Sequence, residues 1–71
     1  MQSIKLSKLA DGVYKPNLIK IYEVSNEGKA LGFIAQDVTL NYWQVRDTYF
    51  VSLSQHSTIK AAVRKARQVL L

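Results

Sequence analysis

The chain ends, from residue 57 to residue 71, in the stretch STIKAAVRKARQVLL, which predicts an amphipathic α-helix. Its apolar residues recur at spacings of three and four and therefore form one stripe along a helix. The stripe consists of Ile59, Ala62, Val63, Ala66, Val69 and Leu70. Ser57 or Thr58 can begin the helix by accepting a hydrogen bond from a free backbone N–H. We therefore expect a helix over residues 58–71 with one apolar and one basic face.

The segments before the helix have the two-residue period of β-strands. The stretches LIKIYEV (18–24) and ALGFIAQ (30–36) flank the short polar sequence Ser-Asn-Glu-Gly. Gly28 supplies the positive φ that a three-residue hairpin loop with a bulge requires. This turn predicts an antiparallel hairpin in which Ile21 lies opposite Phe33.

A second β segment covers residues 41–54, NYWQVRDTYFVSLS. Its alternation fits a hairpin that turns at Asp47, which we favour, and equally one long irregular strand. Residues 1–16 are left open between an edge strand, a segment lying across the sheet and a mobile segment. Ile4 and Leu6 alternate as they would in a short edge strand.

Together these elements predict one α+β domain over residues 1–71, with a small antiparallel sheet of three or four strands over 18–54 packed against one C-terminal helix. The helix would cover the odd-numbered side chains, which are Ile19, Ile21, Leu31, Phe33, Trp43, Val45, Val51 and Leu53. The even-numbered side chains would face the other way, and these are Lys20, Tyr22, Ile34, Gln36, Tyr42, Gln44, Arg46 and Phe50.

The composition is basic, with a formal net charge of +5 over 71 residues. Within residues 55–71 there are four cations and no acid, which favours a polyanionic partner. Ordinary solubility explains such a charge equally well. No apolar run approaches the roughly 18 residues that span a bilayer, and the first residues lack a secretory pattern. We expect a cytoplasmic protein that does not bind membranes.

Catalytic and metal-binding chemistry is not indicated. The chain has no Cys and one His, so neither a disulfide nor a transition-metal site is expected. His56 has no acid near it in sequence that would orient the ring for catalysis. Asp37 and Asp47 lie where turns are expected and are interpreted as acceptors for backbone N–H groups. We expect no enzyme activity, no cofactor and no metal.

The even-numbered face mixes aromatic and basic groups, and three explanations for it stay open. Nucleic acid could lie on it, with rings against bases and Lys20, Gln44 and Arg46 on phosphates or base edges. A protein could bind there, because Tyr, Phe and Arg are favoured in interfaces. Alternatively, Ile4, Leu6 and Leu9 could fold over the rings and make the face part of the core.

The sequence YFVSLSQHSTIKAAVRKA (49–66) leads from an aromatic strand through Ser and Thr into an Ala-rich helix. In this arrangement the chain resembles, over residues 18–70, the DNA-binding domains built from a three-stranded sheet and one helix. These include phage integrase arm-binding domains and the plant ethylene-response-factor type. The resemblance implies that the sheet enters the major groove and that Lys20, Tyr22, Gln44 and Arg46 contact DNA. Because only Lys20 and Arg46 among these four residues are basic, the resemblance implies contact with the DNA backbone more than recognition of bases.

The sequence thus predicts a small accessory nucleic-acid-binding protein of the kind that mobile elements encode, with weak sequence specificity and with DNA favoured over RNA. The alternative is a protein-interaction module, a small inhibitor or adaptor, that uses the same face; a homodimer is a further alternative. The binding residues expected are Lys20, Tyr22, Gln36, Tyr42, Gln44, Arg46 and Phe50 on the sheet and Lys60, Arg64, Lys65 and Arg67 on the helix. The helix cations are otherwise a solvated surface.

Overall fold

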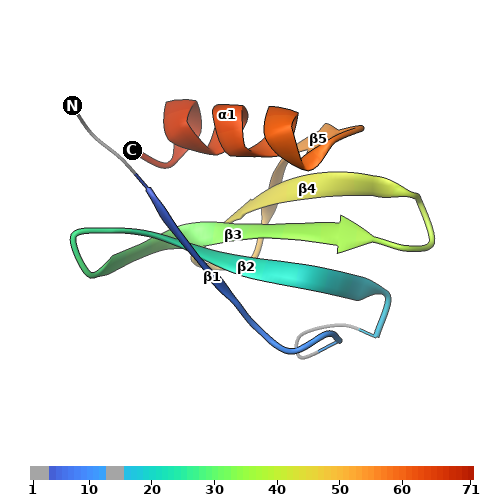
Figure 1. The fold of residues 1–71 in the computed structure, drawn as a ribbon. Helices are drawn as coiled ribbons and strands as arrows, with labels where there is room; N and C mark the ends of the chain where they lie inside the picture. The colour runs from blue at the N-terminus through green and yellow to red at the C-terminus, as the bar shows by residue number, and fades with distance from the viewer. Residues whose placement is uncertain (1–3, 13–15) are drawn as a thin grey trace.

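The computed structural model describes residues 4–12 and 16–71, and in these the chain forms a five-stranded antiparallel sheet and one helix (Figure 1). The strands follow one another in the order β1-β2-β3-β4-β5. Their bounds are β1 Lys5–Lys8, β2 Leu18–Asn26, β3 Lys29–Asp37, β4 Tyr42–Asp47 and β5 Ser52–His56, and the helix is α1 Ile59–Val69. The α+β class and the C-terminal helix are confirmed, whereas the sheet has more strands than the three or four expected.

Two of the alternatives for the strands are thereby decided. β1 pairs with β2, with Leu6 opposite Val24, so the start of the chain supplies an edge strand. The segment 41–54 is a hairpin, because β4 pairs with β5. The expectations for residues 1–3 and 13–15 lie outside the described residues.

Helix α1 begins where the sequence predicts it. The side-chain hydroxyl of Thr58 accepts a hydrogen bond from the backbone N–H of Ala61 at 3.2 Å, which satisfies one of the free donors of the first turn. Ala62 and Ala66 are fully buried, and their small side chains let the helix axis come close to the sheet. In Figure 1 the helix forms a layer on one side of the sheet, above β3 and β4.

The β2–β3 hairpin has a tighter turn than expected. Asn26 pairs with Lys29, and both residues between them, Glu27 and Gly28, have a positive φ, of 51° and 80°. This is a two-residue turn of the kind that matches the twist of antiparallel strands. The expected pairing of Ile21 with Phe33 is wrong, because Phe33 lies opposite Glu23.

An irregularity at Lys20 changes the alternation of β2. Ile19 pairs with Gln36, but the next regular pair is Tyr22 with Ile34, so β2 has an extra residue here. Lys20 adopts a φ of 51°, and its backbone N–H donates to a carboxylate oxygen of Asp11 at 3.0 Å. Beyond this bulge the faces of the strand no longer follow one odd-even rule.

Both faces of the sheet are covered by apolar clusters. The cluster under α1 contains the buried side chains of Val24, Ile34, Trp43, Val45, Ala62 and Ala66, with Ile4, Leu6, Tyr22, Ile59, Val63 and Leu70 packed against them. The cluster on the opposite face contains Leu18, Ile21, Phe33 and Ala35, with Leu9 and Phe50 packed against them. The expected division into an odd covered face and an even exposed face is therefore wrong. Ile34 pairs with Val45, so the helix covers even positions on β3 and odd positions on β4.

The β4–β5 turn spans more residues than a turn centred on Asp47 would. The carboxylate of Asp47 accepts hydrogen bonds from the N–H groups of Tyr49 and Val51, at 2.9 and 3.0 Å. Val45 consequently pairs with Ser54 and not with Tyr49. Val51 and Leu53, expected under the helix, are exposed. The interpretation of Asp47 as an acceptor for turn N–H groups is confirmed.

The helix ends against a glycine of β3. A Cβ atom built on Gly32 would lie 2.3 Å from the carbonyl oxygen of Arg46 and 2.9 Å from Cδ1 of Leu70. Leu70 is the C-terminal cap of α1, and its N–H donates to the carbonyl of Ala66 at 2.8 Å. Gly32 thus provides the space in which both β4 and the end of α1 approach β3.

Candidate functional site

The polar residues expected to bind a ligand from the sheet are bonded to one another inside the protein. Arg46 and Gln44 are only 9% and 4% exposed. The guanidinium of Arg46 donates from Nε and Nη2 to Oε1 of Gln44, at 3.0 and 2.5 Å, and from Nη1 to the carbonyl of Phe50 at 2.7 Å. It also lies 4.6 Å from the centre of the Phe50 ring, which makes an edge contact with Phe33. These donors are used within the fold, so the expected exposed position of Arg46 and Gln44 is wrong.

The remaining sheet residues do not share a face. Tyr22 is half-buried against the cluster under α1, and Gln36 is half-buried opposite Trp43. Tyr42 is half-buried on the other face, opposite Asp37, and Lys20 is exposed at its bulge. The explanation in which the N-terminal segment covers the rings is closest to the structure, because Leu6 and Leu9 pack against the two clusters.

Asp37 organises the turn between β3 and β4. Its carboxylate accepts hydrogen bonds from the N–H groups of Thr39 and Leu40 at 2.9 and 3.1 Å and from the side-chain amide of Asn17 at 3.0 Å. Burial raises the pKa of this carboxyl, but the three hydrogen bonds and the charge of Arg46 outweigh burial and lower the pKa below its ordinary value. The expected role of Asp37 as a turn acceptor is confirmed.

We expect Asp37→Asn to destabilise the protein at neutral pH and to matter less in acid. Because the pKa of Asp37 is lowered by folding, its ionised form stabilises the fold. That contribution is complete above the pKa of the unfolded chain, about 4, and is lost as the pH falls through the lower pKa of the folded state. Urea unfolding followed by Trp43 fluorescence should show the difference between the two proteins shrinking in acid. An equal difference at all pH values would contradict this.

Burial also shifts the pKa of Arg46, whose charge acts on Asp37. It lowers the pKa of Arg46, and the charges of Asp37 and Tyr42 oppose that shift. A desolvated guanidinium of this kind holds a fold together through directional hydrogen bonds and is poorly placed to meet a ligand. The exposed cations other than Lys20 that the sequence predicts to bind lie on the helix.

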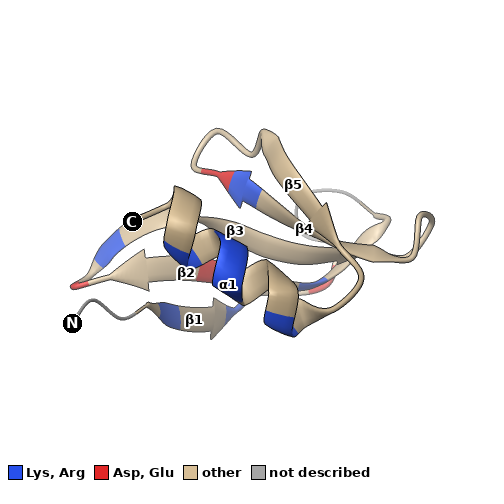
Figure 2. Cartoon of the chain, turned by 90° about the horizontal axis from the view of Figure 1, so that it is seen from above, with Lys and Arg blue, Asp and Glu red and all other residues tan. Residues whose placement is uncertain are grey.

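The basic residues of α1 are brought together on its solvent side, as the sequence predicts. Lys60, Arg64 and Arg67 are exposed and Lys65 is half-buried. Figure 2 shows basic positions along α1 and no acidic position on it. No ion pair joins these cations to an acid within residues 4–12 and 16–71. No described acidic side chain therefore lies within ion-pairing distance of these four cations.

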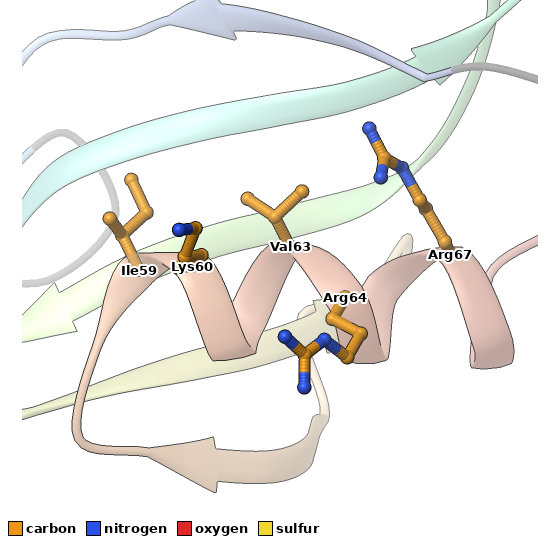
Figure 3. Close-up of a pocket in the computed structure, with 5 residues that line it drawn as sticks. All are labelled: Ile59, Lys60, Val63, Arg64 and Arg67. Carbon is orange, nitrogen blue, oxygen red and sulfur yellow. The ribbon is translucent and has the colours of Figure 1, made fainter.

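An open groove of about 510 Å³ runs along one side of α1, and its described lining consists of Ile59, Lys60, Val63, Arg64 and Arg67. Figure 3 shows that Ile59 and Val63 point toward the strands with Lys60 and Arg67 on the same side of the helix, whereas the Arg64 side chain points to the opposite side. Ile59 and Val63 also pack against the core cluster beneath the helix. The groove thus combines two apolar side chains that pack on the core with three cations in its lining.

A smaller groove of about 190 Å³ lies on the other side of the helix. Its described lining consists of His56, Ala61, Arg64, Lys65 and Gln68. The His56 ring is held by a 2.9 Å hydrogen bond between Nε2 and the hydroxyl of Ser54. Arg64 lines both grooves. The basic surface therefore continues across the outside of α1 from one groove to the other.

Two parts of this surface were not predicted as binding residues. The apolar part of the groove lining, Ile59 and Val63, belongs to the stripe that the sequence assigns to the core, although in sequence these residues directly precede Lys60 and Arg64. His56 and Gln68 were not included either. The i, i+4 spacing of Arg64 and Gln68 was a usable signal, because such residues share one row on a helix.

Among the described residues there is no group of three or more His, Cys, Asp or Glu side chains that could hold a metal ion. The helix found in that part of the chain is too short and too polar to cross a membrane. Comparisons of this chain with protein-family models, curated proteins and solved structures find no significant match.

Proposed function

We propose that this protein binds nucleic acid through the exposed basic side of α1. The observation that carries the proposal is the groove that Lys60, Arg64 and Arg67 line together with Ile59 and Val63, without an acidic residue in its described lining. Lys and Arg side chains that neutralise phosphates supply most of the affinity in such complexes, and they do so without regard to base sequence. Low sequence specificity is therefore expected.

The helix is a better support for this contact than the sheet. Both sheet faces carry apolar clusters, whereas the solvent side of α1 is polar and exposed. Lys60 and Arg67 are seven residues apart, so the cations extend about 10 Å along the helix axis. That length is enough to contact several successive phosphates, because those of one DNA strand rise by about 3.4 Å each.

The test removes the three cations of the larger groove together. In the variant Lys60→Gln, Arg64→Gln, Arg67→Gln the slope of log affinity against log salt for duplex DNA should fall by about 0.9 for each lost phosphate contact, which is about 1.8 when Lys60 and Arg67 contact phosphates and about 2.7 when Arg64 does so as well. Fluorescence anisotropy at several salt concentrations measures this slope. Lys29→Gln, which removes a positive charge from the β2–β3 hairpin, is the control and should change the slope little. Absence of any binding by the unchanged protein at low salt would refute the proposal.

Protein interaction is the second candidate, and one observation favours it. Tyr49 is 87% exposed at the β4–β5 turn, and the nearby Val51 and Leu53 are exposed as well. β5 is an edge of the sheet, and exposed apolar edges are frequent sites of protein contact. The same titration separates the candidates, because a module of this type would show no salt-dependent binding to DNA.

A further inference from the structure

The outward side of α1 has a definite arrangement of charge. Each residue turns the helix by about 100°, so positions two residues before and after buried Ala66 lie on the far side from the sheet. These positions are Arg64 and Gln68. Lys60 and Arg67 line the larger groove on one flank, and Lys65 lines the smaller groove on the other. The helix therefore has a central row with a cation on each side.

This symmetry matters because a single polyanionic strand lying in the larger groove would use one flank only. Cations on both flanks fit a ligand that presents two phosphate chains with space between them. The major groove of B-form DNA is about 12 Å wide, which admits a helix of about 10–12 Å diameter with its side chains. The major groove of A-form RNA is deep and narrow and does not admit side chains in this way.

We propose that α1 enters the major groove of duplex DNA with Arg64 and Gln68 directed at base edges, Lys60 and Arg67 at one phosphate chain, and Lys65 at the other. The inference rests on the proposed nucleic-acid binding and names its ligand. The helix is accessible for this, since it forms the outer layer on its side of the sheet (Figure 1). Arg suits the two acceptors of guanine in the major groove, and Gln suits adenine.

Cations on both sides of α1 distinguish a helix in the major groove from a helix that contacts nucleic acid along one side only. Lys60 and Lys65 are five residues apart and line different grooves. In a major groove both neutralise phosphates, although on different strands. Gln68 carries no charge, so it affects the reading of bases and not the release of counterions.

The experiment compares three probes of one mixed sequence by fluorescence anisotropy: duplex DNA, duplex RNA and single-stranded DNA. The unchanged protein should bind duplex DNA most tightly. Lys60→Gln and Lys65→Gln should each lower the salt slope on duplex DNA by about 0.9. Gln68→Ala should leave the slope on the mixed duplex unchanged and, on an additional DNA duplex rich in A·T pairs, weaken binding by about fivefold. Circular dichroism of each variant confirms that the helix is retained.

The outcomes separate the two proposals. If duplex RNA binds as tightly as duplex DNA, or if Lys65→Gln leaves the slope unchanged while Lys60→Gln lowers it, the major-groove arrangement is overturned and nucleic-acid binding stands. If none of the three probes binds at low salt, both proposals fall. Reduced slopes for both lysine variants, together with preference for duplex DNA, support the arrangement.

Discussion

Arg46→Ala is expected to lower the free energy of unfolding by about 3 kcal/mol, because it removes a buried cation and leaves its acceptors without donors. In the protein, the guanidinium supplies three hydrogen bonds, two to the side chain of Gln44 and one to the carbonyl of Phe50. It also stacks on the Phe50 ring, which lies over the cluster on the side of the sheet away from α1. Urea unfolding followed by Trp43 fluorescence measures the loss.

Two further variants test whether the hydrogen bonds of the guanidinium cause the loss of stability in Arg46→Ala. Arg46→Lys retains the charge but has no planar fork with which to reach both acceptors, so it should recover less than half of the lost stability. Arg67→Ala, at an exposed position of α1, should change stability by about 0.5 kcal/mol or less. If Arg46→Ala were as stable as the unchanged protein, the guanidinium would not contribute to the stability of the fold. At temperatures where Arg46→Ala is still folded, it should bind DNA as the unchanged protein does.

Gly32→Ala is expected to cost about 2–3 kcal/mol, at the upper end of the usual penalty for adding a methyl group to a packed site. The added Cβ would lie 2.3 Å from the carbonyl oxygen of Arg46, which belongs to the backbone of a paired strand and cannot move alone. The side chain of Leu70, the second neighbour, is flexible and can give way. The midpoint of urea unfolding reports the loss.

A double-mutant cycle with Leu70→Ala divides the penalty between the two neighbours. If the backbone contact dominates, most of the cost of Gly32→Ala should persist when Leu70 has been truncated. Gly28→Ala serves as the matched control in the same hairpin, since a Cβ there meets nothing within 4 Å but the residue has a φ of 80°. It should cost about 1 kcal/mol, from backbone strain alone. A similar cost at both positions would mean that crowding at Gly32 is unimportant.

The helix could be predicted accurately from the sequence because everything that defines it is local. The spacing of Ile59, Val63 and Ala66, and the capping group of Thr58, depend on neighbours within a few residues. Strands β2 to β5 lie in the segments expected to be β-structure, and the favoured second hairpin is confirmed, whereas β1 is only one of three alternatives that the sequence leaves open for residues 1–16. What failed was the register, which depends on contacts between strands and on bulges.

The assignment of faces failed for a related reason. In β3 the consecutive residues Phe33, Ile34 and Ala35 are all buried, because each face of the sheet has its own apolar cluster. A strand covered on both sides has no clear alternation from which to tell its faces apart. The backbone conformation of Lys20, with its φ of 51°, then shifted the pattern of β2 by one residue. A lysine in the sequence does not predict a positive φ or a β-bulge at its position.

The candidate site was predicted in part. The helix cations were identified, since residues 55–71 carry four basic residues and no acidic one. The sheet residues were assigned to the same site on the assumption of an exposed even-numbered face. Arg46 shows the difficulty, because a basic residue in a strand has the same sequence pattern whether it meets a ligand or a neighbouring amide.

Ala62 and Ala66 lie on the side of α1 that faces the sheet and Arg64 and Gln68 on its outward side, so the two sides of the helix meet different physical constraints. Positions toward the sheet are constrained by the volume available to them. Outward positions are not limited by the space between the helix and the sheet. Substitutions on the outward side of α1 can therefore change the charge of that surface while the packing between the helix and the sheet stays the same.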